Sequence, residues 1–152
     1  MYLGTYYHTV EEKGRISLPV KFRAQLGKKP IMTRGLDGCL FIFSQAEWMD
    51  FSQGIEETTI TKKTHRDFAR LMANEATELE IDAQGRALVP EHLRALAKLS
   101  KNVVFAGSVN RVELWDRAMY HEYAEGLEKK AEDIAESIEL PARKVGADDK
   151  RT

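Results

Sequence analysis

One pattern of thirteen residues occurs twice in this chain of 152 residues, and the repeat constrains the fold more than any other feature. The first copy spans 11–23 and the second spans 82–94, so matched positions lie 71 residues apart. Each copy has an acidic residue, a Gly-Arg pair after two residues, a proline after three more, and an arginine after another three. Internal repeats indicate that one supersecondary unit is used more than once. We therefore expect two similar units related by a pseudo-two-fold axis.

The similarity continues after each motif, with one residue of slippage. Strands predicted at 31–34 and 39–43 in the first copy correspond to strands predicted at 103–106 and 112–115 in the second. Turn-forming glycine, aspartate and asparagine residues separate the strands of each pair. Both copies are therefore expected to place a second antiparallel strand pair after the motif.

A helix is predicted after each of these strand pairs. Ser44 is expected to cap the first helix, with Glu47 completing a capping box, and this helix is expected to end by Gly54. Asp116 is expected to cap the second helix, which continues as an amphipathic helix until Pro141. The predicted divisions are a first repeat, 1–54, a linker with a helix from 64 to 73, 55–75, a second repeat with a long C-terminal helix, 76–140, and a flexible tail, 141–152.

The motif itself is typical of a tight β-hairpin followed by a short helix. A glycine with positive φ closes such a turn, and a proline suits the first helical position, where its missing N–H costs nothing. The last arginine of each motif lies on this helix, and we expect it to pair with a carboxylate and brace the hairpin. The hairpin strands are predicted at 5–10 with 16–18 and at 78–81 with 87–89. The residues expected to structure the hairpins are Glu11, Gly14, Asp82, Gly85, Pro19, Pro90, Arg23 and Arg94.

Composition and motif searches argue against several other functions. The single cysteine, Cys39, excludes an intramolecular disulfide, and its apolar surroundings predict a buried thiol. The four histidines are scattered, and no nucleophile turn or phosphate-binding loop is present, so we expect no metal, no cofactor and no enzymatic activity. No signal peptide and no apolar segment of about 20 residues is visible, which predicts a cytoplasmic protein.

The two arginines at the predicted hairpin tips, Arg15 and Arg86, are the strongest functional signal. A two-stranded ribbon fits the major groove of DNA, where arginine can donate two hydrogen bonds to guanine. The alternative is that these arginines solvate a turn or pair with Glu11 and Asp82, four residues earlier. Basic residues gather around the first motif, with seven Lys or Arg against five Asp or Glu in the first fifty residues. Further phosphate contacts are expected from Lys13, Lys21, Arg34 and Arg111.

On these residues the chain resembles a known family. The segments that carry the resemblance are 13–19 with Phe22-Arg23 and 81–90 with Leu93-Arg94. They are similar to the MraZ family, bacterial regulators of the cell-division and cell-wall gene cluster, whose members contain two AbrB-like (SpoVT/AbrB, swapped-hairpin) units. The signature of the family hairpin is an aspartate, three residues and an arginine. Asp82 and Arg86 match this signature, whereas the first copy has Glu11 in place of the aspartate.

The resemblance implies a fold class and a set of site residues. The fold is α+β, with two AbrB-like βαβ-type repeats that form a pseudo-two-fold swapped-hairpin β-barrel with flanking helices. Arg15 and Arg86 would contact DNA, with Lys13 beside the first arginine. Gln84 stands where the family has lysine, which would weaken a phosphate contact in the second copy.

The resemblance also implies a function and partners. It predicts a nucleoid-associated, sequence-specific DNA-binding regulator, mainly a repressor of its own operon, that binds G-rich direct repeats in double-stranded DNA. The protein would act as a ring, an octamer or a dodecamer. A different hypothesis is an oligomeric interaction scaffold or an antitoxin-like partner binder, since AbrB-like units also occur in antitoxins. A small hydrolase is a third hypothesis, but no motif supplies the polar pocket that it would need.

Overall fold

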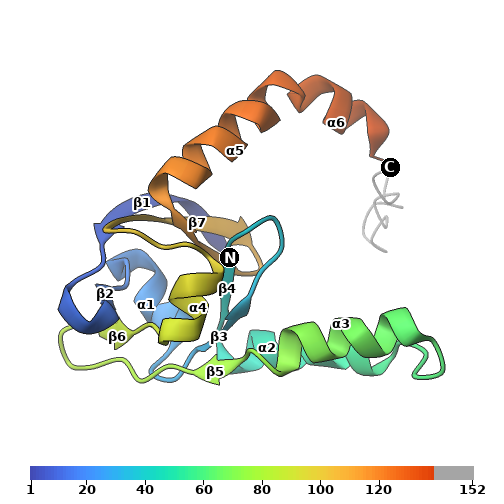
Figure 1. Ribbon diagram of the computed structural model, residues 1–152, viewed down its shortest axis with the longest axis horizontal. Helices are drawn as coiled ribbons and strands as arrows, with labels where there is room; N and C mark the ends of the chain where they lie inside the picture. The colour runs from blue at the N-terminus through green and yellow to red at the C-terminus, as the bar shows by residue number, and fades with distance from the viewer. Residues whose placement is uncertain (139–152) are drawn as a thin grey trace, which may run out of the picture. The chain divides into compact units, whose positions relative to one another are not determined.

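The structure is a computed structural model that describes residues 1–138, and it confirms the α+β class (Figure 1). The described chain contains one six-stranded antiparallel sheet, one two-stranded sheet and six α-helices. It divides into a unit that ends at Tyr120 and contains every described strand, and a second unit that begins at His121. Each unit is described by itself.

The large sheet is built from strands of both repeats. Its order is β1-β7-β8-β4-β3-β5, and the first repeat supplies β1, β3 and β4. The first strand of each repeat pairs with a strand of the other repeat, β1 with β7 and β5 with β3. The eight strands are β1 (Tyr2–Thr9), β2 (Arg15–Ser17), β3 (Ile31–Arg34), β4 (Leu40–Phe43), β5 (Thr77–Glu78), β6 (Arg86–Leu88), β7 (Asn102–Val109) and β8 (Val112–Asp116).

The predicted barrel is not found in this sheet. Among the described strands, β1 and β5 form its two edges, so the sheet stays open. The exchange of first strands between the repeats is nevertheless present, as the pairings of β1 and β5 show. The repeats therefore share one sheet instead of folding as separate hairpin units.

The small sheet is an antiparallel ribbon of β2 and β6, one strand from each motif (Figure 1). The predicted pairing within each motif is wrong. In the first motif only an isolated bridge, between Val10 and Ile16, joins the two predicted strands, and β1 pairs with β7 instead. Ile16 pairs with Ala87 instead, and both side chains are buried. Pairing across the repeats lets both strands bury their short apolar faces in one core, which pairing within a motif would not do.

The helices follow the local sequence signals closely. Their bounds are α1 (Val20–Leu26), α2 (Gln45–Glu56), α3 (Lys63–Ala73), α4 (Glu91–Leu96), α5 (Arg117–Lys129) and α6 (Ala131–Ser137), and a 3-10 turn spans Glu12–Gly14.

Side-chain caps mark the starts of α2 and α5, and a proline precedes α1 and α4. Pro19 and Pro90 were predicted to be the first helical residues, but they stand at the N-caps, and α1 and α4 begin one residue later. The predicted capping box of Ser44 and Glu47 is confirmed, with the Glu47 N–H donating to Ser44 Oγ at 3.1 Å. α2 runs two residues past Gly54, because one glycine lowers helix propensity by only about 1 kcal/mol.

The C-terminal helix differs from its prediction. The expected continuous helix is broken at Lys130, whose φ of −111° separates α5 from α6, and no proline or glycine at this position explains the break. Asp116 caps α5 as predicted, since its Oδ2 accepts the Met119 N–H at 3.3 Å. The predicted stop at Pro141 and the tail at 142–152 lie outside the described residues.

Both faces of the large sheet are covered by apolar side chains. Alternation along β4 sends Leu40 and Ile42 into one cluster, and Phe41 and Phe43 into the other. The first cluster contains buried residues of the ribbon, α1 and α4, and the second is completed by Trp48, Phe51, Tyr120 and other residues beside α2. The inner face of the ribbon therefore packs in the larger core cluster. No helix in the described part of the chain is long and apolar enough to cross a membrane.

Candidate nucleic-acid interface

Both Gly-Arg turns adopt the predicted tight geometry. Gly14 has a φ of 84° and Gly85 a φ of 78°, which confirms the left-handed conformation expected there. The glycine N–H donates to the carbonyl of the acidic residue that begins each turn, Glu11 at 3.1 Å and Asp82 at 3.0 Å. The two turns thus share the glycine conformation and this hydrogen bond, although Lys13 has a positive φ of 66° and its counterpart Gln84 does not. Each turn leads directly to an arginine of the ribbon.

Arg23 and Arg94 brace these turns, but not by the predicted contact. Among residues 1–138 neither guanidinium pairs with a carboxylate, so the predicted partner is wrong. Each Nε donates to a backbone carbonyl just before its own helix, Arg23 to Leu18 at 2.8 Å and Arg94 to Val89 at 3.1 Å. Since a buried carbonyl needs a donor, these bonds fix the arginine side chains in place.

The braces cross between the repeats. A Cβ atom added at Gly14 would lie 2.6 Å from Cζ of Arg94, and one added at Gly85 would overlap Cζ of Arg23. Each guanidinium therefore packs on the glycine turn of the other repeat. The bracing arginine of each motif thus contacts the glycine of the other motif, across the pseudo-two-fold axis.

Replacing Gly85 with alanine is expected to destabilise the protein by about 1–3 kcal/mol, because an L-residue is strained at this φ and the new methyl group displaces Arg23. The matched control is Gly54→Ala in α2, where no neighbour lies within 4 Å. That change should stabilise the helix by about 0.5–1 kcal/mol. Chemical denaturation of both variants measures the difference. Equal effects would contradict the proposed packing of Arg23 on the turn.

Arg15 and Arg86 lie on the same outward face of the ribbon. The register pairs Arg15 with Leu88 and Ser17 with Arg86, while Ile16 and Ala87 occupy the opposite, buried face. Residues that are directly opposite on two antiparallel strands share a face, so all four flanking side chains point away from the core. The two arginines are diagonal neighbours, with Cα atoms about 7–8 Å apart.

The environments of the two arginines differ. Arg15 is exposed, and no partner for its side chain occurs in the part of the chain that the structure describes. The Arg86 side chain is only 29% exposed, and its guanidinium pairs with Asp82 at 3.1 Å and with Glu11 at 3.6 Å. The predicted alternative, pairing with an acid, is thus found for Arg86 and not for Arg15.

The difference follows from the acidic residue that begins each turn. Oδ1 of Asp82 accepts the N–H groups of Gln84 and Arg86, each at 2.9 Å, so the short side chain caps its own turn. Hydrogen bonds from the backbone and side chain of Arg86, and from Gln84, hold the pKa of Asp82 below its ordinary value. Glu11 makes no such cap and reaches across to Arg86 instead. The substitution of glutamate in the first copy therefore restrains the arginine of the second.

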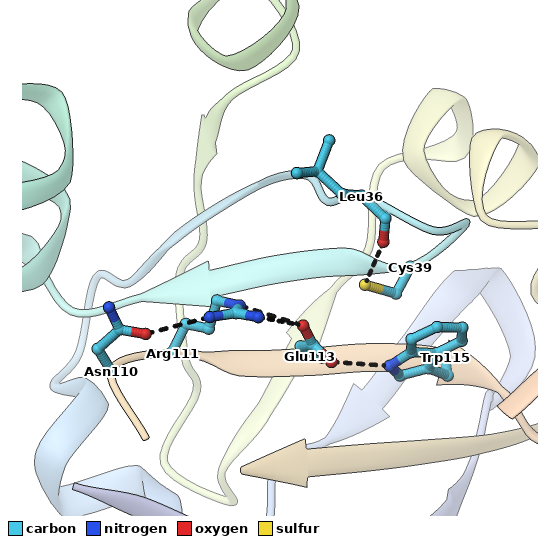
Figure 2. Close-up of polar contacts among 6 residues, drawn as sticks. All are labelled: Leu36, Cys39, Asn110, Arg111, Glu113 and Trp115. Atoms are coloured by element: carbon cyan, nitrogen blue, oxygen red, sulfur yellow. Dashed lines mark hydrogen bonds and ion pairs between the residues drawn. The ribbon is translucent and has the colours of Figure 1, made fainter. Parts of the chain in front are cut away.

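The other predicted contacts divide into two groups. Lys13, Lys21 and Gln84 are exposed, Lys13 and Gln84 beside the ribbon arginines in their turns. Arg111 is partly exposed, and its guanidinium is engaged by Asn110 and Glu113, as Figure 2 shows. Its Nη2 donates to Glu113 at 2.8 Å and its Cζ lies 4.6 Å from the centre of the Phe41 ring. The surroundings of Arg111 thus assign it to packing on the sheet, not to a phosphate contact.

The same close-up contains Cys39, which is fully buried as predicted (Figure 2). Its Sγ lies 3.2 Å from the Leu36 carbonyl, and burial raises the pKa of the thiol. Glu113 also accepts the Trp115 indole N–H at 3.2 Å.

Nε of Arg34 is buried without a hydrogen-bond partner among residues 1–138. The Nε of Arg34 is thus not presented to solvent, and the Arg111 guanidinium is already engaged by Glu113 and the Phe41 ring.

Sequence reasoning missed two lysine-bearing loops beside the ribbon. The loop after α1 carries Lys28, and the loop after α4 carries Lys98 and Lys101. Both loops line open grooves together with the bracing arginine of the preceding helix. The signal was available in the sequence, since the lysines of both loops follow the motif helix at nearly the same offset.

A protein-family comparison identifies the repeated architecture. The family model described as "MraZ protein, putative antitoxin-like" matches the chain twice, over residues 1–71 and 72–140. This chain belongs to the MraZ family. The two MraZ matches each contain one Gly-Arg motif, one bracing arginine and one lysine loop.

Curated MraZ relatives are similar over nearly their whole length. The transcriptional regulator MraZ of Carboxydothermus hydrogenoformans is 44% identical over 138 residues, which cover 91% of this chain and 96% of that protein. The transcriptional regulator MraZ of Caldanaerobacter subterraneus subsp. tengcongensis is 42% identical over 139 residues, with 91% and 97% covered. That of Ligilactobacillus salivarius is 43% identical over 138 residues, with 91% and 96% covered.

Proposed function

We propose that the protein is a DNA-binding transcriptional regulator that reads duplex DNA with the outward face of the β2–β6 ribbon. The observation that carries this proposal is the shared face of Arg15 and Arg86. A separation of about 7–8 Å between their Cα atoms is smaller than the width of one major groove. Both side chains therefore fit one major groove, which is about 12 Å wide and admits a two-stranded ribbon. The names of the MraZ relatives support the same function.

The site residues take distinct roles in this proposal. Arg15 and Arg86 contact guanine edges, Lys13 contacts a phosphate beside Arg15, and Gln84 makes a weaker contact beside Arg86. No cofactor and no catalytic step is part of the proposed function.

Finer features of the proposal concern the target and the assembly. We propose that the target is a set of G-rich direct repeats upstream of the protein's own cell-division and cell-wall operon, and that repression is the main outcome. Direct repeats suit an oligomeric ring of eight or twelve copies, because successive subunits meet successive sites. Support for a subunit contact comes from apolar side chains of α5 and α6 that remain 38–55% exposed, namely Tyr123, Leu127, Ile134 and Ile138. Binding to chromosomal DNA would place the protein in the cytoplasm, on the nucleoid.

An antitoxin-like partner binder is the second candidate, because the family model carries that description. Such a protein would use the ribbon to hold another protein and would be indifferent to DNA. A gel shift with the region upstream of the protein's own gene tests the choice. Retardation that is stronger than with a scrambled duplex and falls steeply with added salt is expected, since phosphate contacts release counterions. Absence of retardation at low salt would refute DNA binding.

Glu11→Gln is expected to tighten DNA binding about 2- to 10-fold, because it releases Arg86 from one of its two carboxylate partners. Exposed ion pairs of this kind contribute up to about 1 kcal/mol, so the fold itself should change little. Titration by fluorescence anisotropy measures the affinity. Glu12→Gln is the matched control, because it removes the same charge from the neighbouring residue, which forms no ion pair within the described chain. An equal gain in both variants would show that only net charge matters.

A further inference from the structure

Two lysine loops flank the ribbon, and neither belongs to the repeated motif. The first loop, 27–30, carries Lys28 and Lys29, and the second, 97–101, carries Lys98 and Lys101. Lys29 pairs with Glu78 at 3.9 Å. Lys28, Lys98 and Lys101 are exposed, and within residues 1–138 none of these three pairs with a carboxylate. Several other cations of the first unit are instead engaged by acidic neighbours, as in the ion pairs of α3. The ammonium groups of Lys28, Lys98 and Lys101 are thus available to an anion beside the ribbon.

Backbone hydrogen bonds fix each loop beside the turn of the opposite repeat. The Ile81 N–H donates to the Lys28 carbonyl at 3.2 Å, and the Val10 N–H donates to the Lys101 carbonyl at 2.8 Å. Ile81 and Val10 are the residues immediately before the two Gly-Arg turns. The lysines of one repeat are therefore placed next to the turn of the other, by the same crossing that brings each bracing arginine onto the opposite glycine.

The antiparallel register assigns the loops to opposite ends of the ribbon. The first turn leads directly into Arg15, so Lys98 and Lys101 lie at the Arg15 end. The second turn leads into Arg86, so Lys28 lies at the Arg86 end. A ribbon of three residues is about 10 Å long, which is close to the 12 Å width of the major groove. A ribbon that lies across the groove would therefore place its two ends beside the two phosphate backbones that border the groove.

We propose that Lys98 and Lys101 grip the phosphates of one DNA strand and that Lys28 grips those of the other, each acting beside the arginine of the opposite repeat. This inference rests on the proposed function. Lysine suits the role, since its ammonium group is a mobile point charge that needs no fixed geometry. Phosphate contacts of this kind set position and affinity without reading sequence.

The resulting surface is polarised. Within residues 1–138, the Arg15 end combines two unpaired lysines with an arginine that has no acidic partner. The Arg86 end combines the unpaired Lys28, and Lys29 paired with Glu78, with an arginine held by Glu11 and Asp82. The Arg15 end therefore forms the stronger half of the site.

A salt series of anisotropy titrations tests this inference on the full chain. Each phosphate contact contributes about 0.9 to the slope of log affinity against log salt concentration. Lys98→Gln with Lys101→Gln should lower the slope by about 1.8 per bound subunit, and Lys28→Gln should lower it by about 0.9. The preference for the upstream region over a scrambled duplex should remain the same in both variants. The matched control is Lys62→Gln with Lys63→Gln, at the start of α3, far from β2 and β6 in Figure 1.

The outcomes separate this inference from the function on which it rests. Unchanged slopes in a protein whose binding still depends on Arg15 would overturn the lysine assignment alone. An equal loss in the α3 control would also overturn it, because net charge would then explain the effect. Failure of the unaltered protein to bind DNA would overturn the proposed function and this inference together.

Discussion

Replacing Arg15 with alanine is expected to weaken binding to the upstream region about 5- to 150-fold, which corresponds to the 1–3 kcal/mol of a bidentate arginine–guanine pair. The side chain is exposed on the ribbon and has no partner within the described residues, so its removal should leave the fold unchanged. The loss should be largest for the upstream region and small for a scrambled duplex, because a base contact carries sequence information and a phosphate contact does not. Anisotropy titration against both duplexes measures this ratio.

Two further variants define what the result means. Arg86→Ala should cost less affinity than Arg15→Ala, because Glu11 and Asp82 already hold the Arg86 guanidinium and oppose its approach to DNA. Arg70→Ala removes an exposed arginine from α3 and should have no effect on the preference between duplexes. Circular dichroism controls for folding. Full sequence preference in the Arg15→Ala variant would refute the proposed role of the ribbon face.

The parts of the fold that depend on local chemistry could be predicted from the sequence. Positive φ at Gly14 and Gly85, the capping box at Ser44 and the start of the motif helices are each determined by a few adjacent residues. Membership of the MraZ family was also predictable, because the whole motif recurs with fixed spacing. Local signals were sufficient wherever a few adjacent residues, within about one turn of the chain, determine the conformation.

Partner choice could not be predicted, because it depends on contacts between distant residues. Two strands with the same short alternation, such as β2 and β6, can pair with several neighbours, and periodicity alone does not select one. The selection comes from burying Ile16 against Ala87 in the core. Crossing of Arg23 onto Gly85 follows from that choice, so a carboxylate partner was expected where a glycine turn is found.

The DNA-contacting roles of Arg15 and Arg86 remain predictions, and the asymmetry between these two arginines could not be predicted from the sequence. Both motifs contain an acid four residues before the arginine, which suggests two equivalent ion pairs. One methylene group separates the outcomes, since Asp82 is short enough to cap its own turn and Glu11 is not. The free end of Glu11 then reaches Arg86 across a strand pairing that the sequence does not reveal.

Ile16→Ala is expected to destabilise the protein by about 2–5 kcal/mol, the range for removing a buried isoleucine side chain and leaving a cavity. Ile16 has 0% exposure on the inner face of the ribbon, inside the larger core cluster. Leu88→Ala is the matched comparison on the outer face, where the side chain is 53% exposed, and it should change stability by no more than about 0.5 kcal/mol. Urea denaturation at one fixed protein concentration measures both, since the proposed subunit assembly would make apparent stability depend on concentration.

This pair of variants also tests whether the ribbon is one structural element. Ile16 and Leu88 come from different repeats, yet both occupy the three-residue ribbon, on opposite faces. If β2 and β6 pair as described, Ile16→Ala destabilises the ribbon on which Arg15 lies. The measured DNA affinity then falls, because a larger fraction of the protein is unfolded. Truncation on the outer face should leave stability intact. Similar destabilisation by the two changes would mean that Leu88 is buried against something else, and the face that we assign to DNA would be occupied.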